Sequence, residues 1–314
     1  MALCYSIVVG SGYAMKLVAS DRTTFIADFK SLIKSGVLLA NVLPVFSGFW
    51  SAIYITDAIF MDHFGLFLIT MLGSTFVMAG ALVINNWYDV DIDTVMARTK
   101  RRPTVTGHFS LKTVLYIGII CTILGFIFLA FTTFEAVIYA FIGWFTYVVL
   151  YTLWSKRRYT INTVIGSVSG AVSPLIGWAT IAPANHVVPI VLFLILFIFQ
   201  MPHTYAIAIR KYEEYKAAGV AMLPVVRGIK ITKIHFLIYI ICLIPLPFFL
   251  DELGTVYITI STLLNIGWLL LSIRGFKVKD DIKWARINFL YSVNYIFITF
   301  LLVVAVTLPD YFGW

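Results

Sequence analysis

A series of long apolar segments constrains this chain more than any other feature of its sequence. A helix needs about 20 mainly apolar residues to cross a bilayer. Nine segments of about that length can be marked, at 35–55, 64–86, 113–132, 136–154, 161–181, 188–209, 234–250, 254–273 and 287–308. Only 12% of the 314 residues are charged, against about 25% in a soluble domain. We therefore predict an all-α, polytopic membrane protein with nine transmembrane helices in one domain.

The positive charges predict how these helices are oriented. When the connections are numbered alternately, all 23 Lys and Arg residues fall on one side of the membrane. The other side carries only acidic residues, namely Asp57, Asp62, Glu135, Asp251, Glu252 and Asp310. Because Lys and Arg mark the cytoplasmic side, we expect the N-terminus inside the cell membrane and the C-terminus outside. Residues 1–34 then form a cytoplasmic segment rather than a signal peptide, 35–308 the membrane domain, and 309–314 a short outer tail.

So basic a surface attracts anionic lipid headgroups or a phosphate-rich small molecule. Nothing in the sequence matches a motif that reads nucleic-acid grooves, so we expect no nucleic-acid partner.

The stretch NNWYDVDIDTVMARTKRRP, residues 85–103, crowds acids and bases directly after an apolar segment. If the helix continues through it, residues four apart share one face. Asn85, Asp89 and Asp93 form that stripe, while Asp91 faces elsewhere. The spacing therefore selects two of the three carboxylates.

Two carboxylates on one helix face repel each other unless a positive charge lies between them. Magnesium is the natural candidate, because it takes hard oxygen ligands and is often held by one or two carboxylates together with substrate phosphates. The cations that would then face the phosphate oxygens are Arg98, Lys100, Arg101 and Arg102. The alternative is a solvated loop whose acids and bases pair with one another.

The pattern Asn85-x3-Asp89-x3-Asp93 followed by ARTKRRP resembles the first aspartate-rich motif of the UbiA superfamily of intramembrane prenyltransferases. That resemblance implies a nine-helix bundle in which the motif binds the magnesium-complexed diphosphate of an isoprenoid donor. The motif alone does not identify the acceptor.

Residues 151–180, YTLWSKRRYTINTVIGSVSGAVSPLIGWAT, resemble a segment of the heme O synthases, a branch of this superfamily. Lys156 and Arg157 match its basic pair, although ordinary anchoring at the membrane surface is the alternative. Lys34 and Asn41 also resemble features of the first helix. Since a polar Asn41 inside an apolar span needs a partner, a hydrogen bond between helices is as good an interpretation as substrate contact.

Residues 201–228 resemble the second motif of the family, which in most relatives is also rich in aspartate. Here His203 occupies the first acidic position and Arg210 the middle one, and Glu214 followed by Tyr215 ends the motif. Heme O synthases share the histidine and the final acid–tyrosine pair, and Lys211 aligns with a basic residue of theirs. We expect His203 to face a substrate pocket as an iron ligand, a base or a hydrogen-bonding group.

The resemblance implies farnesyl transfer from farnesyl diphosphate to a vinyl group of protoheme IX, with water addition, to give heme O. Its implied catalytic residues are Asp89, Asp93, His203 and Glu214, with Mg²⁺ held by the two aspartates. Its implied substrate-binding residues are Asn41, Asn85, Arg98, Lys100, Arg101, Lys156, Arg157, Lys211 and Tyr215. Expected partners are the lipid bilayer and a downstream heme A synthase or terminal oxidase. The alternatives are prenylation of a quinone-type acceptor, transport of heme or a lipid diphosphate, and a heme-binding assembly factor.

Overall fold

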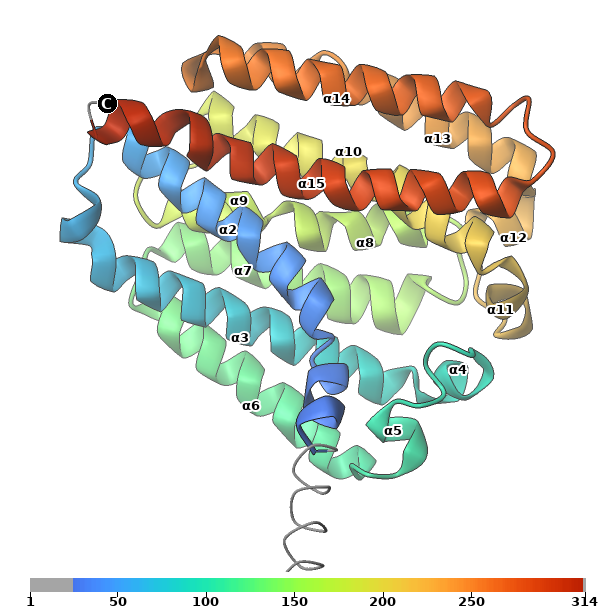
Figure 1. Ribbon diagram of the computed structural model, residues 1–314. Helices are drawn as coiled ribbons and strands as arrows, with labels where there is room; N and C mark the ends of the chain where they lie inside the picture. The colour runs from blue at the N-terminus through green and yellow to red at the C-terminus, as the bar shows by residue number, and fades with distance from the viewer. Residues whose placement is uncertain (1–24, 313–314) are drawn as a thin grey trace, which may run out of the picture.

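The structure is a computed structural model that describes residues 25–312 (Figure 1). Every regular element among those residues is a helix, and eight of the helices are long and apolar enough to cross a membrane. They are α2 (Ser35–Ile55), α3 (Phe64–Tyr88) preceded by η1 (Phe60–His63), α6 (Leu111–Ala130), α7 (Phe134–Phe145) continued by η2 (Thr146–Ser155), α10 (Val187–Arg210), α13 (Ile229–Leu243) followed by η3 (Leu246–Phe249), α14 (Gly254–Arg274) preceded by η4 (Asp251–Leu253), and α15 (Asp281–Phe312). The predicted all-α membrane fold is confirmed.

The fifth predicted segment, 161–181, is the exception to this pattern because it consists of two short helices. Val172 separates α8 (Asn162–Ala171) from α9 (Ser173–Ala179), and Pro174 lies in the first turn of α9, where a missing N–H costs least. All residues from 171 to 180 are buried. A broken helix is tolerated at membrane depth when it is surrounded by protein rather than by lipid.

Glycines let α9 approach α2 until the two backbones touch. A Cβ atom added to Gly48 would overlap the carbonyl of Pro174, and one added to Gly177 would overlap the carbonyl of Val45. Small residues at such crossings allow close packing of membrane helices. This contact anchors the broken segment in the middle of the bundle.

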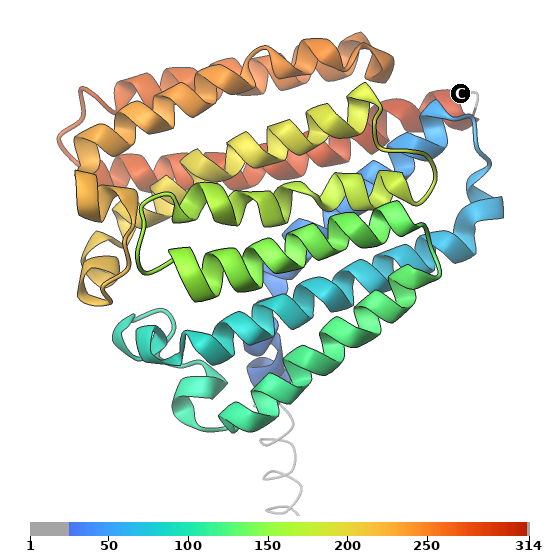
Figure 2. The ribbon, with the colours of Figure 1, turned by 180° about the vertical axis from the view of Figure 1, so that it is seen from behind.

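The short helices of the polar loops gather at one end of the bundle, on the right in Figure 1 and on the left in Figure 2. They are α4 (Val90–Val95), α5 (Pro103–Thr106), α11 (Tyr212–Ala217) and α12 (Leu223–Arg227). η1, η4 and the end of α15 lie at the other end. The loops rich in Lys and Arg therefore share one face of the protein.

Several helix ends differ from the predicted boundaries. α15 begins at Asp281 rather than 287, since its first turns carry Lys283 and Arg286 and lie outside any apolar window. It also continues to Phe312, through most of the expected outer tail. Of the expected cytoplasmic segment 1–34, residues 1–24 lie outside the described part of the chain.

Candidate active site

The first aspartate motif keeps its helical spacing across a helix end. α3 ends at Tyr88 and α4 begins at Val90, yet the Asp89 N–H donates to the Asn85 carbonyl at 3.0 Å and the Asp93 N–H to the Asp89 carbonyl at 2.9 Å. Asn85, Asp89 and Asp93 are 2%, 1% and 3% exposed, whereas the Asp91 side chain is 61% exposed. The stripe selected from the sequence is the buried face of the motif.

Both buried carboxylates are paired with cations. Asp93 Oδ2 accepts from Arg102 Nη1 at 2.5 Å, and Asp89 Oδ2 accepts from the Lys156 ammonium. The exposed Asp91 pairs with both terminal nitrogens of Arg157, at 2.6 and 2.8 Å. Acids and bases thus do pair with one another, as the alternative interpretation held, but the pairs that involve Asp89 and Asp93 are buried rather than solvated.

Asn85 links three parts of the site. Its Oδ1 accepts from Lys34 Nζ at 2.5 Å, and its Nδ2 donates to Asp89 Oδ2 at 2.7 Å and to Thr152 Oγ1 at 3.1 Å. Lys34 has a left-handed backbone, with φ 49° and ψ 55°, where the helical residues 25–32 meet α2. Such a conformation is unfavourable for a residue with a Cβ. Burial lowers the pKa of the Lys34 ammonium, and the nearby charges of Arg102 and Lys156 lower it further.

A basic cleft of about 410 Å³ lies beside the motif. Its charged lining residues are Lys30, Lys34, Arg98, Arg101 and Arg102. Lys100, which we also expected near the phosphates, is exposed and does not line this cleft. Such a cluster of positive charge suits a polyanionic group.

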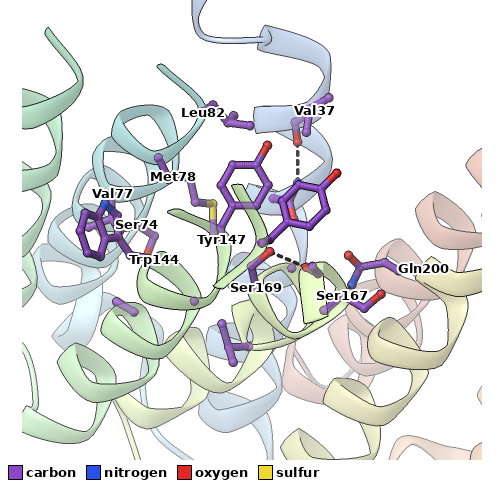
Figure 3. Close-up of a pocket in the computed structure, with 18 of the residues that line it drawn as sticks. Val37, Ser74, Val77, Met78, Leu82, Trp144, Tyr147, Ser167, Ser169 and Gln200 are labelled. Atoms are coloured by element: carbon purple, nitrogen blue, oxygen red, sulfur yellow. Dashed lines mark hydrogen bonds between the residues drawn. The ribbon is translucent and has the colours of Figure 1, made fainter. Parts of the chain in front are cut away.

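An apolar cavity of about 230 Å³ opens inside the bundle among α2, α3, α7, η2, α8, α9 and α10 (Figure 3). Val37 lines both this cavity and the basic cleft, so the two meet at the start of α2. Together they form a site for a molecule with an anionic head and an apolar tail.

A π-helix brings aromatic side chains to this junction. η2 has the wider π-helical turn, seen in the Lys156 N–H donating to the Tyr151 carbonyl five residues back at 2.9 Å. Tyr147 and Tyr151 line the cavity with ring centroids 5.5 Å apart, and the Lys156 ammonium lies 5.7 Å from the Tyr151 ring centre. The wide turn therefore places two tyrosines and the partner of Asp89 in one region.

The second motif is tied to the first mainly through Tyr215. This residue packs in a small apolar cluster with Ile92 and Met96, which belong to the first motif region. Burial raises the pKa of the Tyr215 hydroxyl, and Arg98 and Lys156 are near enough to oppose that rise. In contrast, Glu214 pairs locally with Lys211 at 2.6 Å.

His203 does not line this cavity. Its Nδ1 lies 2.7 Å from Ser292 Oγ, and its ring centroid lies 5.3 Å from that of Phe289, both on α15. Gln200 and Thr204 supply the α10 lining instead. Successive helix positions are about 100° apart, so His203 turns away from the face that Thr204 presents. Arg210 lies two helical turns after His203 on the same face of α10, and its guanidinium carbon is 4.6 Å from the Phe289 ring centre.

Four site residues were not identified from the sequence: Tyr147, Tyr151, Thr152 and Gln200. The available signal was their polarity inside apolar spans, because a polar side chain at membrane depth requires a partner. Asn41, which was identified, does line the cavity.

Comparison with known proteins agrees with this architecture. The model of the UbiA prenyltransferase family matches residues 41–294, so this chain belongs to that family. It is 54% identical over 286 residues to a protoheme IX farnesyltransferase of Oceanobacillus iheyensis, covering 91% of each chain. It is 50% identical to the enzyme of the same name from Bacillus mycoides, covering 91% of this chain and 94% of that one.

Two solved structures share the fold at low sequence identity. A UbiA homolog from Archaeoglobus fulgidus bound to DMAPP and Mg²⁺ superposes with a TM-score of 0.63 at 16% identity, covering 88% of this chain and 99% of that one. A digeranylgeranylglyceryl phosphate synthase superposes with a TM-score of 0.71 at 19% identity, covering 90% and 99%. The chain is thus an integral membrane prenyltransferase by fold and family.

Proposed function

We propose that this protein transfers the farnesyl group of farnesyl diphosphate to a vinyl group of protoheme IX, with addition of water, and so makes heme O. The observation that carries this proposal is the 54% identity to a protoheme IX farnesyltransferase across nine-tenths of both chains. The geometry supports it, because the apolar cavity and the basic cleft meet beside the buried acids.

The donor set fits a magnesium ion bound together with a diphosphate. Asp89 Oδ1 is buried and accepts no hydrogen bond from the described residues, and its ion pair with Arg157 Nη2 is long, at 3.7 Å, so this hard oxygen has room for a closer cation. Among the described residues no cluster of three or more His, Cys, Asp or Glu could hold a metal alone. Mg²⁺ bound by Asp89 and Asp93 would therefore take its other ligands from the diphosphate and from water, and would supply charge neutralisation for the leaving group.

The chain's own residues then have separate tasks. Lys156 and Arg102, which balance the two acids, are placed to share their charge with the diphosphate as the allylic C–O bond breaks. Lys34, Arg98 and Arg101 add positive charge from the cleft. The cavity houses the isoprenoid tail and keeps bulk water from the allylic cation.

Several of the predicted site residues contribute less directly in this proposal. Asn85 orients Asp89 through its hydrogen bond, and Tyr215 packs the second motif against the first. Arg157 chiefly holds Asp91. Glu214 and Lys211 form a local pair at the rim, and His203 stays a candidate for the acceptor on the α15 side.

The arrangement of charges supports an orientation with the acid pair at the cytoplasmic face of the cell membrane, the N-terminus inside and the C-terminus outside. Heme enters as substrate rather than cofactor. Its product would pass to a heme A synthase or a terminal oxidase in assembly.

The test is mass spectrometry of porphyrins after purified protein in detergent is incubated with Mg²⁺, farnesyl diphosphate and protoheme IX. We expect heme O, and no prenylated product when hydroxybenzoate replaces heme. Prenylation of hydroxybenzoate alone would assign the protein to quinone synthesis. Heme absorbance without consumption of farnesyl diphosphate would indicate a carrier or an assembly factor.

A further inference from the structure

Polar side chains from α2, α8 and α10 line one side of the apolar cavity, and an isoprenoid tail has no group that can hydrogen-bond to them. Asn41 on α2, Ser167 and Ser169 on α8, and Gln200 and Thr204 on α10 all line it. In Figure 3, Gln200, Ser167 and Ser169 lie away from Trp144, Ser74 and Val77. Polar groups at membrane depth are retained where they have a partner or a function.

The two amides of this wall have a defined orientation. Asn41 Nδ2 donates to the Val37 carbonyl at 2.8 Å. Gln200 Nε2 donates to the carbonyls of Ser167 at 2.9 Å and Leu196 at 3.0 Å. A backbone carbonyl only accepts hydrogen bonds, so each amide nitrogen must be the atom that faces it. The side-chain oxygens are thereby left as acceptors, and no donor among the described residues bonds to either.

Both oxygens converge above Gly170. A methyl group built on Gly170 would lie 2.8 Å from Gln200 Oε1 and 3.0 Å from Asn41 Oδ1. That position is one C–C bond from the Gly170 Cα and also 3.0 Å from Gln200 Nε2, so it is not itself a ligand site, but it shows that the two acceptor oxygens are at most about 6 Å apart, close enough for one ligand with two donors to bridge them. Water is such a ligand, because its O–H···O bonds are about 2.8 Å long and a buried water typically makes about three of them.

We propose that Asn41 and Gln200 hold the water molecule that becomes the hydroxyl group of the product, an inference that rests on the proposed function. A water that donates both protons to the amide oxygens turns its lone pairs toward the cavity. Its oxygen is then the nucleophile, while the two amide oxygens are occupied by its O–H groups.

The step balances as follows. The vinyl π electrons form a bond from the terminal vinyl carbon to the farnesyl carbon that has lost diphosphate, and the inner vinyl carbon becomes cationic. The water oxygen donates a lone pair to that inner carbon, a C–O bond forms, and one water proton is released to solvent. No oxidant or reductant is needed.

The position of the wall separates this water from the leaving group. Asn41 lies about 9 Å along α2 from its first residue, at the 1.5 Å rise of each helical residue. Lys34, which immediately precedes α2, belongs to the basic cleft. Asn41 lies one helical turn beyond Val37, where the cleft and the cavity meet, so a water on Asn41 is close to the reacting carbons without touching the Lys and Arg side chains of the cleft.

The experiment measures the ratio of hydroxylated to dehydrated farnesyl porphyrin rather than the rate of product formation. We compare Gln200→Met, Asn41→Leu and Gly170→Ala with the unmodified protein by mass spectrometry of porphyrins. Without the bound water, the cation loses a proton and gives a farnesyl porphyrin lighter by one water. We expect the ratio of hydroxylated to dehydrated product to fall at least about tenfold in each variant, the effect of one lost hydrogen bond of ordinary strength.

Gly170→Ala is the sharpest of the three variants because it leaves both amides in the chain. Its new methyl group would lie within 3.0 Å of both oxygens and of Gln200 Nε2, so both amide groups must shift and can no longer bridge the water. Ser169→Ala is the matched control, since its hydroxyl lines the same cavity but donates to the Gly166 carbonyl at 2.6 Å. It should keep the ratio of the unmodified protein.

Variants that consume farnesyl diphosphate and still give only the hydroxylated product would overturn the inference. An equal fall in both products, with the ratio unchanged, would overturn it as well. Those results leave the proposed function standing, whereas failure of the unmodified protein to make any farnesyl porphyrin would remove both.

Discussion

The two motif regions of this protein differ in whether their ion pairs are buried or exposed. In the first, Asp89 and Asp93 are buried and each is paired with a cation: Lys156, 67 residues away, for Asp89 and Arg102, nine residues away, for Asp93. In the second, Glu214 pairs with Lys211 three residues away, and both remain partly exposed. A buried charge destabilises the folded protein unless it is paired. Two buried carboxylates are more costly than an ordinary loop requires, which indicates that the first region has a function. We infer that the leaving-group chemistry depends on the first motif and that the second is supportive.

The largest expected effect is at the buried acids. Asp89→Asn and Asp93→Asn keep the size of each side chain and remove its charge, so each should lower heme O formation by about 10²- to 10³-fold. Initial rates of heme O formation at saturating Mg²⁺ provide the measurement. If either variant lost less heme O formation than Glu214→Gln, the conclusion that the first motif matters more than the second would be wrong.

The next effect is at the cation that balances Asp89. Lys156→Gln removes a charge-assisted hydrogen bond of about 1.5–3 kcal/mol, which corresponds to roughly a tenfold to hundredfold loss of rate. Arg102→Gln is the matched variant at Asp93. Both should raise the farnesyl diphosphate concentration needed for half-maximal rate. An unchanged concentration dependence would mean that these cations serve only to fold the site.

A smaller effect is expected in the second motif. A partly exposed ion pair contributes about 0.2–1 kcal/mol, so Glu214→Gln should lower the rate by at most about fivefold. Lys211→Gln should match it, because either substitution breaks the same pair. If Glu214→Gln alone abolished activity, the buried Glu214 Oε2 would have to be assigned a direct role.

The smallest effect is expected at the third aspartate of the first motif. Asp91 is exposed and pairs with Arg157, so Asp91→Asn should change heme O formation by less than about twofold. The same assay run beside Asp89→Asn makes this variant a control for charge removal within one helix turn. A loss comparable to that of Asp89→Asn would show that the motif works by total charge rather than by its buried face.

Periodicity in the sequence was sufficient for the parts of this structure that depend on one helix at a time. The apolar segments predicted the spans, and the four-residue spacing of Asn85, Asp89 and Asp93 predicted the buried stripe. Each of these follows from the length or the turn of a single helix.

Features that depend on contacts between helices could not be predicted. The pairing of Asp89 with Lys156 joins residues far apart in the sequence. It relies on the wide π-helical turn of η2, and no residue pattern predicts such a turn. His203 illustrates the same limit, because a rotation of about 100° separates its position from the cavity-lining Thr204. The side chains of Asn41 and Gln200 come together only because α2, α8 and α10 pack against one another.

The central claim is that Asp89 and Asp93 bind a magnesium diphosphate at the mouth of the cavity. Calorimetric titration of farnesyl diphosphate, with and without Mg²⁺, into the unmodified protein and into the Asp89→Asn, Asp93→Asn double variant tests it most directly. We predict binding that requires Mg²⁺ in the unmodified protein and no magnesium-dependent binding in the double variant. Equal, magnesium-dependent binding by both proteins would contradict the account.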